Sequence, residues 1–332
     1  MQYIVRRKKT LSDGPHVLIT VLICLLCWIA CYFHSSGFPL NAGDAVLPFW
    51  HDLLTGLKSK VVVYSFGLII MALTAFIIQR INDIEMLVSE RTRLVFMLYI
   101  LLTSTNLEII PFNNGTIVLL CLVGMIYELF KTFQSPEDKS NLFNAGAYIG
   151  MAGLFMPQIL WFVPLLWLGM YQLYSLSYRS FIVSLMGALT IYWFVLTWSL
   201  WKHDFSMFRN IYASLTDIQL FSVFLSSQYY IGLIFIAFLM IPVLLSIKMD
   251  AVGNRVRVRQ MLSFLSNMAI WTCILLCLYG KNAGVLLAVL YLVLSVLLAY
   301  FIENMRKRFY FLLYYFILIL SSGSFILQLW NY

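Results

Sequence analysis

The feature that most constrains this chain is a series of apolar runs that are each long enough to cross a lipid bilayer as a helix. Residues 16–33 read HVLITVLICLLCWIACYF, and residues 284–301 read GVLLAVLYLVLSVLLAYF. An α-helix rises about 1.5 Å per residue, so about 20 apolar residues cross a hydrocarbon core of about 30 Å. Only 11% of the residues are charged, whereas soluble domains carry about 25%. The sequence therefore predicts an all-α, polytopic integral membrane protein.

Eleven runs of this kind predict eleven transmembrane spans. They cover residues 16–33, 61–79, 94–110, 116–133, 145–156, 158–174, 181–201, 229–247, 261–279, 284–302 and 309–330. The fifth run is too short to cross a bilayer alone, and Pro157 follows it where the chain must turn. Irregular backbone is tolerated at membrane depth only against other protein segments or water. We therefore expect residues 145–174 to form a short hairpin buried among the other helices, with two complete spans as the alternative.

The positive charges indicate the orientation of these spans. With a cytoplasmic N-terminus, 17 of the 22 Lys and Arg residues fall in inner segments, as the positive-inside rule requires. The inner segments then carry the whole formal charge of +8, and the outer segments are neutral. We expect the C-terminus on the outer side of a bacterial inner membrane. The basic segments 255–259 and 306–308 fit anionic membrane lipids, and nucleic acid is not an expected partner.

The predicted spans have no ionisable residue at their centres. Such a residue is costly in hydrocarbon and marks proton or ion pathways, so its absence argues against an ion-coupled pump. The nearest candidate, Glu128, lies three residues before Lys131 near the inner end of a span. This spacing predicts a structural ion pair on one helix face.

Residues capable of chemistry gather in the predicted outer segments. Three of the four histidines and five carboxylates lie there, on three separate loops. Converging carboxylates and imidazoles can bind a divalent cation or act as a general base, although loops in water also carry such residues without a function. Residues 45–54 and 205–212 each have one apolar and one polar face, which predicts helices lying flat at the membrane interface.

The order of the predicted helices resembles that of one group of membrane enzymes. An inner N-terminus, one span and an outer loop with acidic residues come first. Residues 93–131, RLVFMLYILLTSTNLEIIPFNNGTIVLLCLVGMIYELFK, and residues 142–170, LFNAGAYIGMAGLFMPQILWFVPLLWLGM, follow. This pattern resembles the GT-C superfamily of polyprenyl-phosphate-dependent membrane glycosyltransferases over about the first 200 residues. It also resembles uncharacterised membrane proteins of Bacteroidota. The resemblance implies one membrane domain, with a GT-C-like module at 1–201, additional spans at 202–332 and no soluble domain.

The resemblance implies transfer of a sugar from a polyprenyl-phosphate carrier at the outer face. Asp44 or Asp52 is the counterpart of the acidic residue in the first loop of the family, which acts as a base toward the acceptor or helps to bind a metal. A second carboxylate of some members corresponds to Glu108. The candidate ligands of a Mg or Mn ion are Glu108, His51, His203 and Asp204. The candidates for neutralising the leaving phosphate are Lys58, Lys60, Lys202 and Arg209.

Two other functions stay open. The first outer loop has no paired acidic dipeptide and the outer turn 111–115 has no aspartate, so the chain can instead be a non-catalytic subunit bound to a membrane-protein partner. Small residues at Gly146, Ala147, Gly150 and Gly153 predict a close helix-packing face, which such a subunit would use. A lipid or glycan flippase is the third class, because it can work through a groove without central charges.

Overall fold

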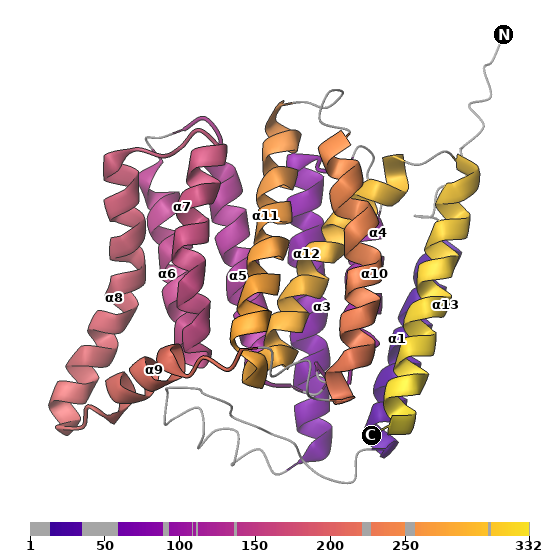
Figure 1. The fold of residues 1–332 in the computed structure, drawn as a ribbon, viewed down its shortest axis with the longest axis horizontal. Coiled ribbons are helices and arrows are strands. Elements are labelled where there is room, and N and C mark those ends of the chain that lie inside the picture. Colours follow the sequence, from indigo (N-terminus) through magenta and orange to yellow (C-terminus); the bar gives the residue numbers. More distant parts are fainter. Residues whose placement is uncertain are drawn as a thin grey trace.

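The computed structural model describes residues 14–34, 59–88, 93–107, 109–110, 112–135, 138–220, 227–249, 256–304 and 307–331. Over these residues the chain folds into α-helices joined by turns, with two short 3-10 helices and without a β-strand. The helices stand side by side in one bundle (Figure 1). The prediction of an all-α protein is confirmed for this part of the chain.

The helices follow the predicted spans closely. The α-helices are α1 (Gly14–His34), α3 (Lys60–Glu85), α4 (Leu94–Ser104), α5 (Asn114–Lys131), α6 (Lys139–Phe155), α7 (Phe162–Gln172), α8 (Tyr178–Lys202), α9 (Ser206–Thr216), α10 (Ser227–Met249), α11 (Val256–Leu278), α12 (Ala283–Asn304) and α13 (Lys307–Asn331). The 3-10 helices are η1 (Pro157–Trp161) and η4 (Gly280–Asn282). Each predicted range overlaps a helix, with ends that differ by six residues at most.

Seven of the described helices are long and apolar enough to cross a membrane, namely α1, α3, α5, α8, α11, α12 and α13. Helix α8 has 25 residues, which corresponds to a length of about 37 Å. Tyr178 at its start is 81% exposed, and Trp201 near its end is 83% exposed. Tyrosine and tryptophan favour the two membrane interfaces. These helices indicate an integral membrane protein, and the count of eleven spans stays a prediction.

Helix α12 forms the centre of the bundle. Of its most apolar stretch, 89% is buried, and α4, α5, α10 and α11 pack against it. Its sequence is apolar on every face, as expected of a helix surrounded by others. One cluster of buried side chains continues through α1, α3, α4, α5, α6 and α7 and through α10 to α13. Residues before and after position 201 therefore share one core.

The hairpin expected at residues 145–174 consists of a first helix that is longer than predicted, the 3-10 helix η1 and the 11-residue helix α7. Helix α6 begins at Lys139 and has 17 residues, so the expected short helix from 145 to 156 is wrong at its start. Residues 139–144 continue the helix beyond the apolar run that defined the prediction. The chain does turn at Pro157, which opens η1, because proline cannot continue the preceding helix. Figure 1 shows α6 and α7 side by side.

The small residues of α6 pack against α8. A Cβ atom added to Gly146 would lie 1.9 Å from the backbone oxygen of Ser184, and one added to Gly187 would lie 2.1 Å from that of Phe143. At Gly150 the nearest atom would be the Ala188 oxygen, at 2.8 Å. The two helix backbones therefore touch, as in small-residue contacts between membrane helices. The predicted packing face is used within the chain.

Two ion pairs lie where α3 and α5 end. The predicted pair is confirmed, with Lys131 Nζ 3.3 Å from Glu128 Oε1. The second joins α11 to α3, with Arg257 Nη2 2.5 Å from Glu85 Oε2. We call this the inner end of the bundle, and we call the opposite end, where the C-terminus lies (Figure 1), the outer end. These names follow the predicted orientation, which stays a prediction.

Candidate functional site at the outer end of the bundle

Helix α4 ends inside the bundle. The predicted span 94–110 forms a helix only over Leu94–Ser104, and ten of these 11 residues are buried. The prediction was wrong beyond Ser104, where serine, threonine and asparagine follow one another and favour local side-chain bonds over a continued helix. Thr105, directly after the helix, donates from its Oγ1 to the oxygens of Leu101 at 3.0 Å and Leu102 at 3.3 Å. Thr105 thus caps two of the carbonyls that have no partner within α4.

The backbone after α4 is irregular, buried and tied to two other helices. Asn106 Nδ2 donates to Tyr291 Oη of α12 at 3.4 Å, and the N–H of Leu107 donates to Gln328 Oε1 of α13 at 3.2 Å. Tyr291 lies eight residues after Ala283, where α12 begins, which is about 12 Å along the helix. Non-helical backbone at such a depth marks functional regions of many membrane proteins. We call the described residues from 105 to 113 the α4 break.

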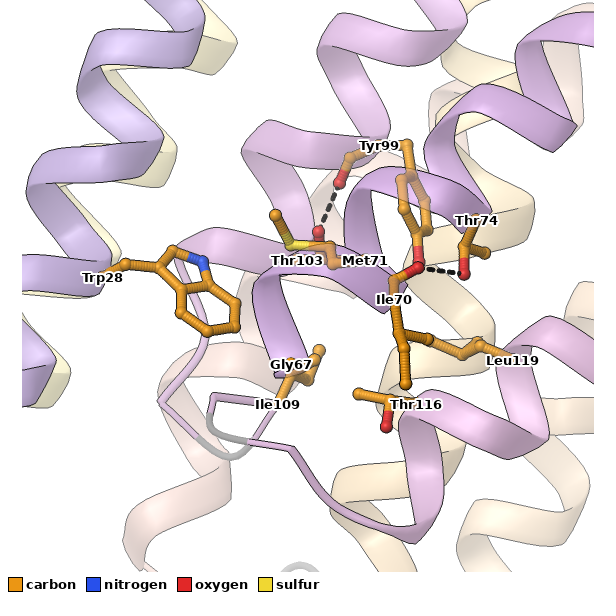
Figure 2. Close-up of a pocket in the computed structure, with 10 residues that line it drawn as sticks. All are labelled: Trp28, Gly67, Ile70, Met71, Thr74, Tyr99, Thr103, Ile109, Thr116 and Leu119. Carbon is orange, nitrogen blue, oxygen red and sulfur yellow. Dashed lines mark hydrogen bonds between the residues drawn. The ribbon is translucent and has the colours of Figure 1, made fainter. Parts of the chain in front are cut away.

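A small cavity lies beside the α4 break. Figure 2 shows its lining, which includes Trp28 of α1, Thr74 of α3, Tyr99 and Thr103 of α4, and Thr116 of α5. The Tyr99 phenol is hydrogen-bonded to Thr74. The space open to the centre of a water molecule is about 10 Å³, enough for about one water. The cavity is therefore too small for a sugar or a lipid, and its lining is mostly apolar.

A second set of hydrogen bonds holds the outer ends of three other elements together. Tyr279 Oη, at the end of α11, accepts from Trp161 Nε1 of η1 at 3.0 Å and donates to the oxygen of Leu215 in α9 at 2.7 Å. Trp271 Nε1 donates to the backbone oxygen of Trp161 at 2.8 Å. We call these hydrogen bonds of Tyr279, Trp161, Trp271 and Leu215 the Tyr279 network. The network fixes the position of α9, which lies across the outer end of the bundle beside the end of α8 (Figure 1).

Helix α9 is amphipathic, as the pattern of residues 205–212 predicts. Met207 and Ile211 are buried against Leu154 of α6 and Val195 of α8, whereas Arg209 is exposed. A helix with this division suits the membrane interface. The other predicted interfacial helix, at 45–54, lies outside the described residues.

The predicted phosphate-binding cations differ in their surroundings. Lys202 is exposed at the end of α8, with its Nζ 5.3 Å from the ring centre of Trp198. Neither Lys202 nor Arg209 forms an ion pair within the described part of the chain. Lys60, the first residue of α3, donates from its Nζ to the backbone oxygen of Tyr32. Lys202 and Arg209 therefore remain available to an anion, and Lys60 is engaged within the protein.

His203 and Asp204 form the turn between α8 and α9. His203 has a left-handed backbone (φ 51°) that ends α8. Asp204 Oδ1 accepts the N–H of Ser206 at 2.8 Å, and this hydrogen bond holds the pKa of the Asp204 carboxyl below its ordinary value. Both side chains are exposed. The roles of His203 and Asp204 in forming this turn are enough to explain why the two residues occur there.

The remaining predicted site residues lie outside the part of the chain that the structure describes. They are Asp44, His51, Asp52, Lys58 and Glu108. Among the described residues, no three His, Cys, Asp or Glu side chains are close enough together to hold a metal ion. The roles predicted for these residues therefore stay predictions.

The buried polar residues of the outer half are absent from the sequence prediction. Asn106, Tyr291, Gln328 and Tyr279 are neutral residues within or beside apolar runs, so no charge marks them in the sequence. The signal that could have found the α4 break is the run Thr103-Ser104-Thr105-Asn106. These four residue types favour local side-chain bonds to the backbone over a continued helix.

No protein-family model, no curated protein and no solved structure matches this chain. The resemblance to the GT-C superfamily therefore rests on the sequence pattern alone, and stays a prediction. A function for the chain has to be argued from the geometry of its outer end.

Proposed function

We propose that the chain is an integral membrane protein of eleven spans with its N-terminus in the cytoplasm. Helices at all the predicted ranges support this count, although α4, α6 and α7 are shorter than the seven membrane-length helices. The predicted orientation can be tested with single cysteines and a membrane-impermeant maleimide applied to intact cells. A cysteine at Ala213 in α9 should react, and one at Ser140 in α6 should react only after lysis. The opposite labelling pattern would show that the spans have the opposite orientation.

We propose further that the outer end binds a polyprenyl-phosphate-linked sugar and transfers the sugar to an acceptor. The observation that carries this proposal is the position of Lys202 and Arg209. Lys202 is exposed at the end of α8, and Arg209 is exposed on α9, the amphipathic helix that follows and suits the membrane interface. The adjacent surface of α8 is aromatic, with Trp193 68% and Phe194 72% exposed. A lipid whose tail lies along α8 would bring its phosphate to these two cations.

The reaction requires a base, which the first outer loop supplies in this proposal. Asp44 or Asp52 takes the proton of an acceptor hydroxyl. The hydroxyl oxygen then forms a bond to the anomeric carbon, and the bond between that carbon and the phosphate oxygen breaks. The phosphate leaves with the electron pair, and Lys202 and Arg209 stabilise its charge.

The resemblance implies a divalent cation, but the described residues supply few ligands for one. They contribute only His203 and Asp204 from the predicted ligand set, and the Asp204 carboxylate already binds the Ser206 N–H. We therefore derive no step through a metal. The alternative of a non-catalytic subunit loses one of its arguments, because the small-residue face of α6 is covered by α8.

Purified protein in lipid nanodiscs, supplied with a polyprenyl-phosphate sugar labelled in the sugar, tests the proposal. We expect label to leave the lipid fraction, and we expect Lys202→Gln combined with Arg209→Gln to slow this release at least tenfold. Asp44→Asn and Asp52→Asn identify the base, and Asp83→Asn on the exposed inner part of α3 is the matched control.

Equal release by all variants would refute the site. Absence of release from the wild-type protein would refute the enzyme. In that case, movement of intact labelled lipid across proteoliposomes would favour the flippase, and a partner that co-purifies in fixed ratio would favour the subunit.

A further inference from the structure

Lys60 lies at a junction between the two helices that flank the first outer segment. Helix α1 ends at His34 and α3 begins at Lys60. The Lys60 ammonium group donates to the backbone oxygen of Tyr32, in the last turn of α1. The last carbonyls of a helix have no partner within it and carry partial negative charge. Lys60, the first residue of α3, therefore caps α1.

Aromatic rings from both helices surround the same ammonium group. Its nitrogen lies 4.6 Å from the ring centre of Tyr32 and 5.9 Å from that of Tyr64. The two rings are nearly perpendicular, with centres 5.4 Å apart. Tyr64 Oη is 3.6 Å from Cys31 Sγ, which adds another contact between α3 and α1. A cation within about 6 Å of an aromatic face is attracted to it, so one charge holds groups from two helices.

We propose that Lys60 is a positioning residue that fastens the two ends of segment 35–59, and that it does not bind substrate phosphate. We call this arrangement the Lys60 clamp. Segment 35–59 contains Asp44, His51 and Asp52. The clamp thus joins the last turn of α1 to the first turns of α3, the two described points between which this segment runs.

The predicted cations then have different roles. Lys202 contacts one ring of its own helix, that of Trp198, and within the described part of the chain it joins no second element. Lys60 joins α1 to α3. The clamp itself is inferred from the contacts of Lys60, and only the contrast with phosphate-binding cations rests on the proposed function.

Limited proteolysis of the full chain in nanodiscs tests the clamp. A protease that cuts before aspartate, followed by intact mass measurement, reports cleavage at Asp44 and Asp52 within the segment. Cleavage at Asp217, beyond α9, serves as the internal reference. We expect Lys60→Met to speed cleavage within the segment about tenfold relative to this reference. Lys202→Met, the matched control, should leave the ratio unchanged.

Two further variants separate the charge from the rings. Lys60→Arg keeps a cation and donors, so it should stay within about twofold of the wild-type ratio. Tyr32→Leu removes one ring and keeps the backbone acceptor, so its cleavage should be intermediate. If Lys60→Met fails to elute as a folded protein, Lys60→Gln and Tyr32→Leu decide the matter, and wild-type cleavage in both would overturn the clamp.

The outcomes are independent of the sugar-transfer assay. Faster cleavage in Lys60→Met without any sugar release from wild-type protein would overturn the proposed enzyme and leave the clamp. A wild-type cleavage ratio in Lys60→Met would overturn the clamp whatever the transfer assay shows. Loss of polyprenyl-phosphate binding in Lys60→Arg with an unchanged cleavage ratio would also overturn it, because the lysine would then act on the ligand.

Discussion

The contact between α6 and α8 makes a sharp prediction about two glycines. Gly146→Ala places a methyl group where the Ser184 oxygen would be 1.9 Å away, and Gly187→Ala places one 2.1 Å from the Phe143 oxygen. Both obstacles are backbone atoms, which cannot rotate away as a side chain can. The helices must separate by more than 1 Å to admit either methyl group. We expect both variants to be destabilised.

The size of the effect follows from two opposing contributions. Overpacking of this kind costs about 1–3 kcal/mol. Alanine is favoured over glycine within a helix by about 1 kcal/mol, which offsets part of that cost. Gly323 of α13 is the matched control, because an added Cβ there meets nothing within 4 Å. Gly323→Ala should therefore gain the helix preference alone, and the difference between it and Gly146→Ala should equal the packing cost, about 2 kcal/mol.

Thermal unfolding in one detergent, followed by tryptophan fluorescence, measures these differences as shifts of a few °C. Because both methyl groups separate the same helix pair, the double variant should lose less stability than the two single losses together. The reasoning would be refuted if Gly146→Ala were as stable as Gly323→Ala. Additive losses in the double variant would refute the shared contact.

Three further predictions concern other polar contacts. Arg257→Met removes the partner of the Glu85 carboxylate, whose side chain is 4% exposed. This variant should lose about 2 kcal/mol of unfolding free energy in thermal unfolding. Lys131→Met, which breaks the other ion pair, should lose less than about 1 kcal/mol. Asn106→Leu should cost about 1–3 kcal/mol, and Tyr291→Phe should recover part of it in a double-mutant cycle. The Asp204 carboxyl resonance should titrate below the ordinary pKa, so its bond to Ser206 should persist above that lowered pKa and be lost as pH falls through it.

The positions of the helices could be predicted because membrane spans need long apolar runs. The run at 284–302 becomes α12, with ends displaced by two residues at most. Where polar residues extend or end a helix, hydropathy fails. Lys139 to Asn144 continue α6 beyond its apolar run, and Thr103 to Asn106 end α4 within one. In both cases backbone hydrogen bonds determine where the helix begins or ends, and hydropathy does not measure them.

The candidate site could be predicted only in part. The amphipathic pattern of residues 205–212 and the charges of Lys202 and Arg209 are visible in the sequence. The engagement of Lys60 with Tyr32 is not, because it depends on where α1 ends relative to α3. Likewise, Asn106 and Tyr291 are 185 positions apart in the chain, and no local pattern connects them.

The buried polar side chains that hold the α4 break are neutral. Both described ion pairs lie at the inner end, whereas Asn106, Tyr291 and Gln328 form neutral hydrogen bonds in the outer half. Buried neutral groups need only a partner, while buried charges also need to offset a large desolvation cost. Neutral side chains can therefore hold the α4 break at depth, but they cannot supply a strong base or a counter-charge. If the outer end is catalytic, its ionisable groups must come from the loops and from α8 and α9, where water reaches them.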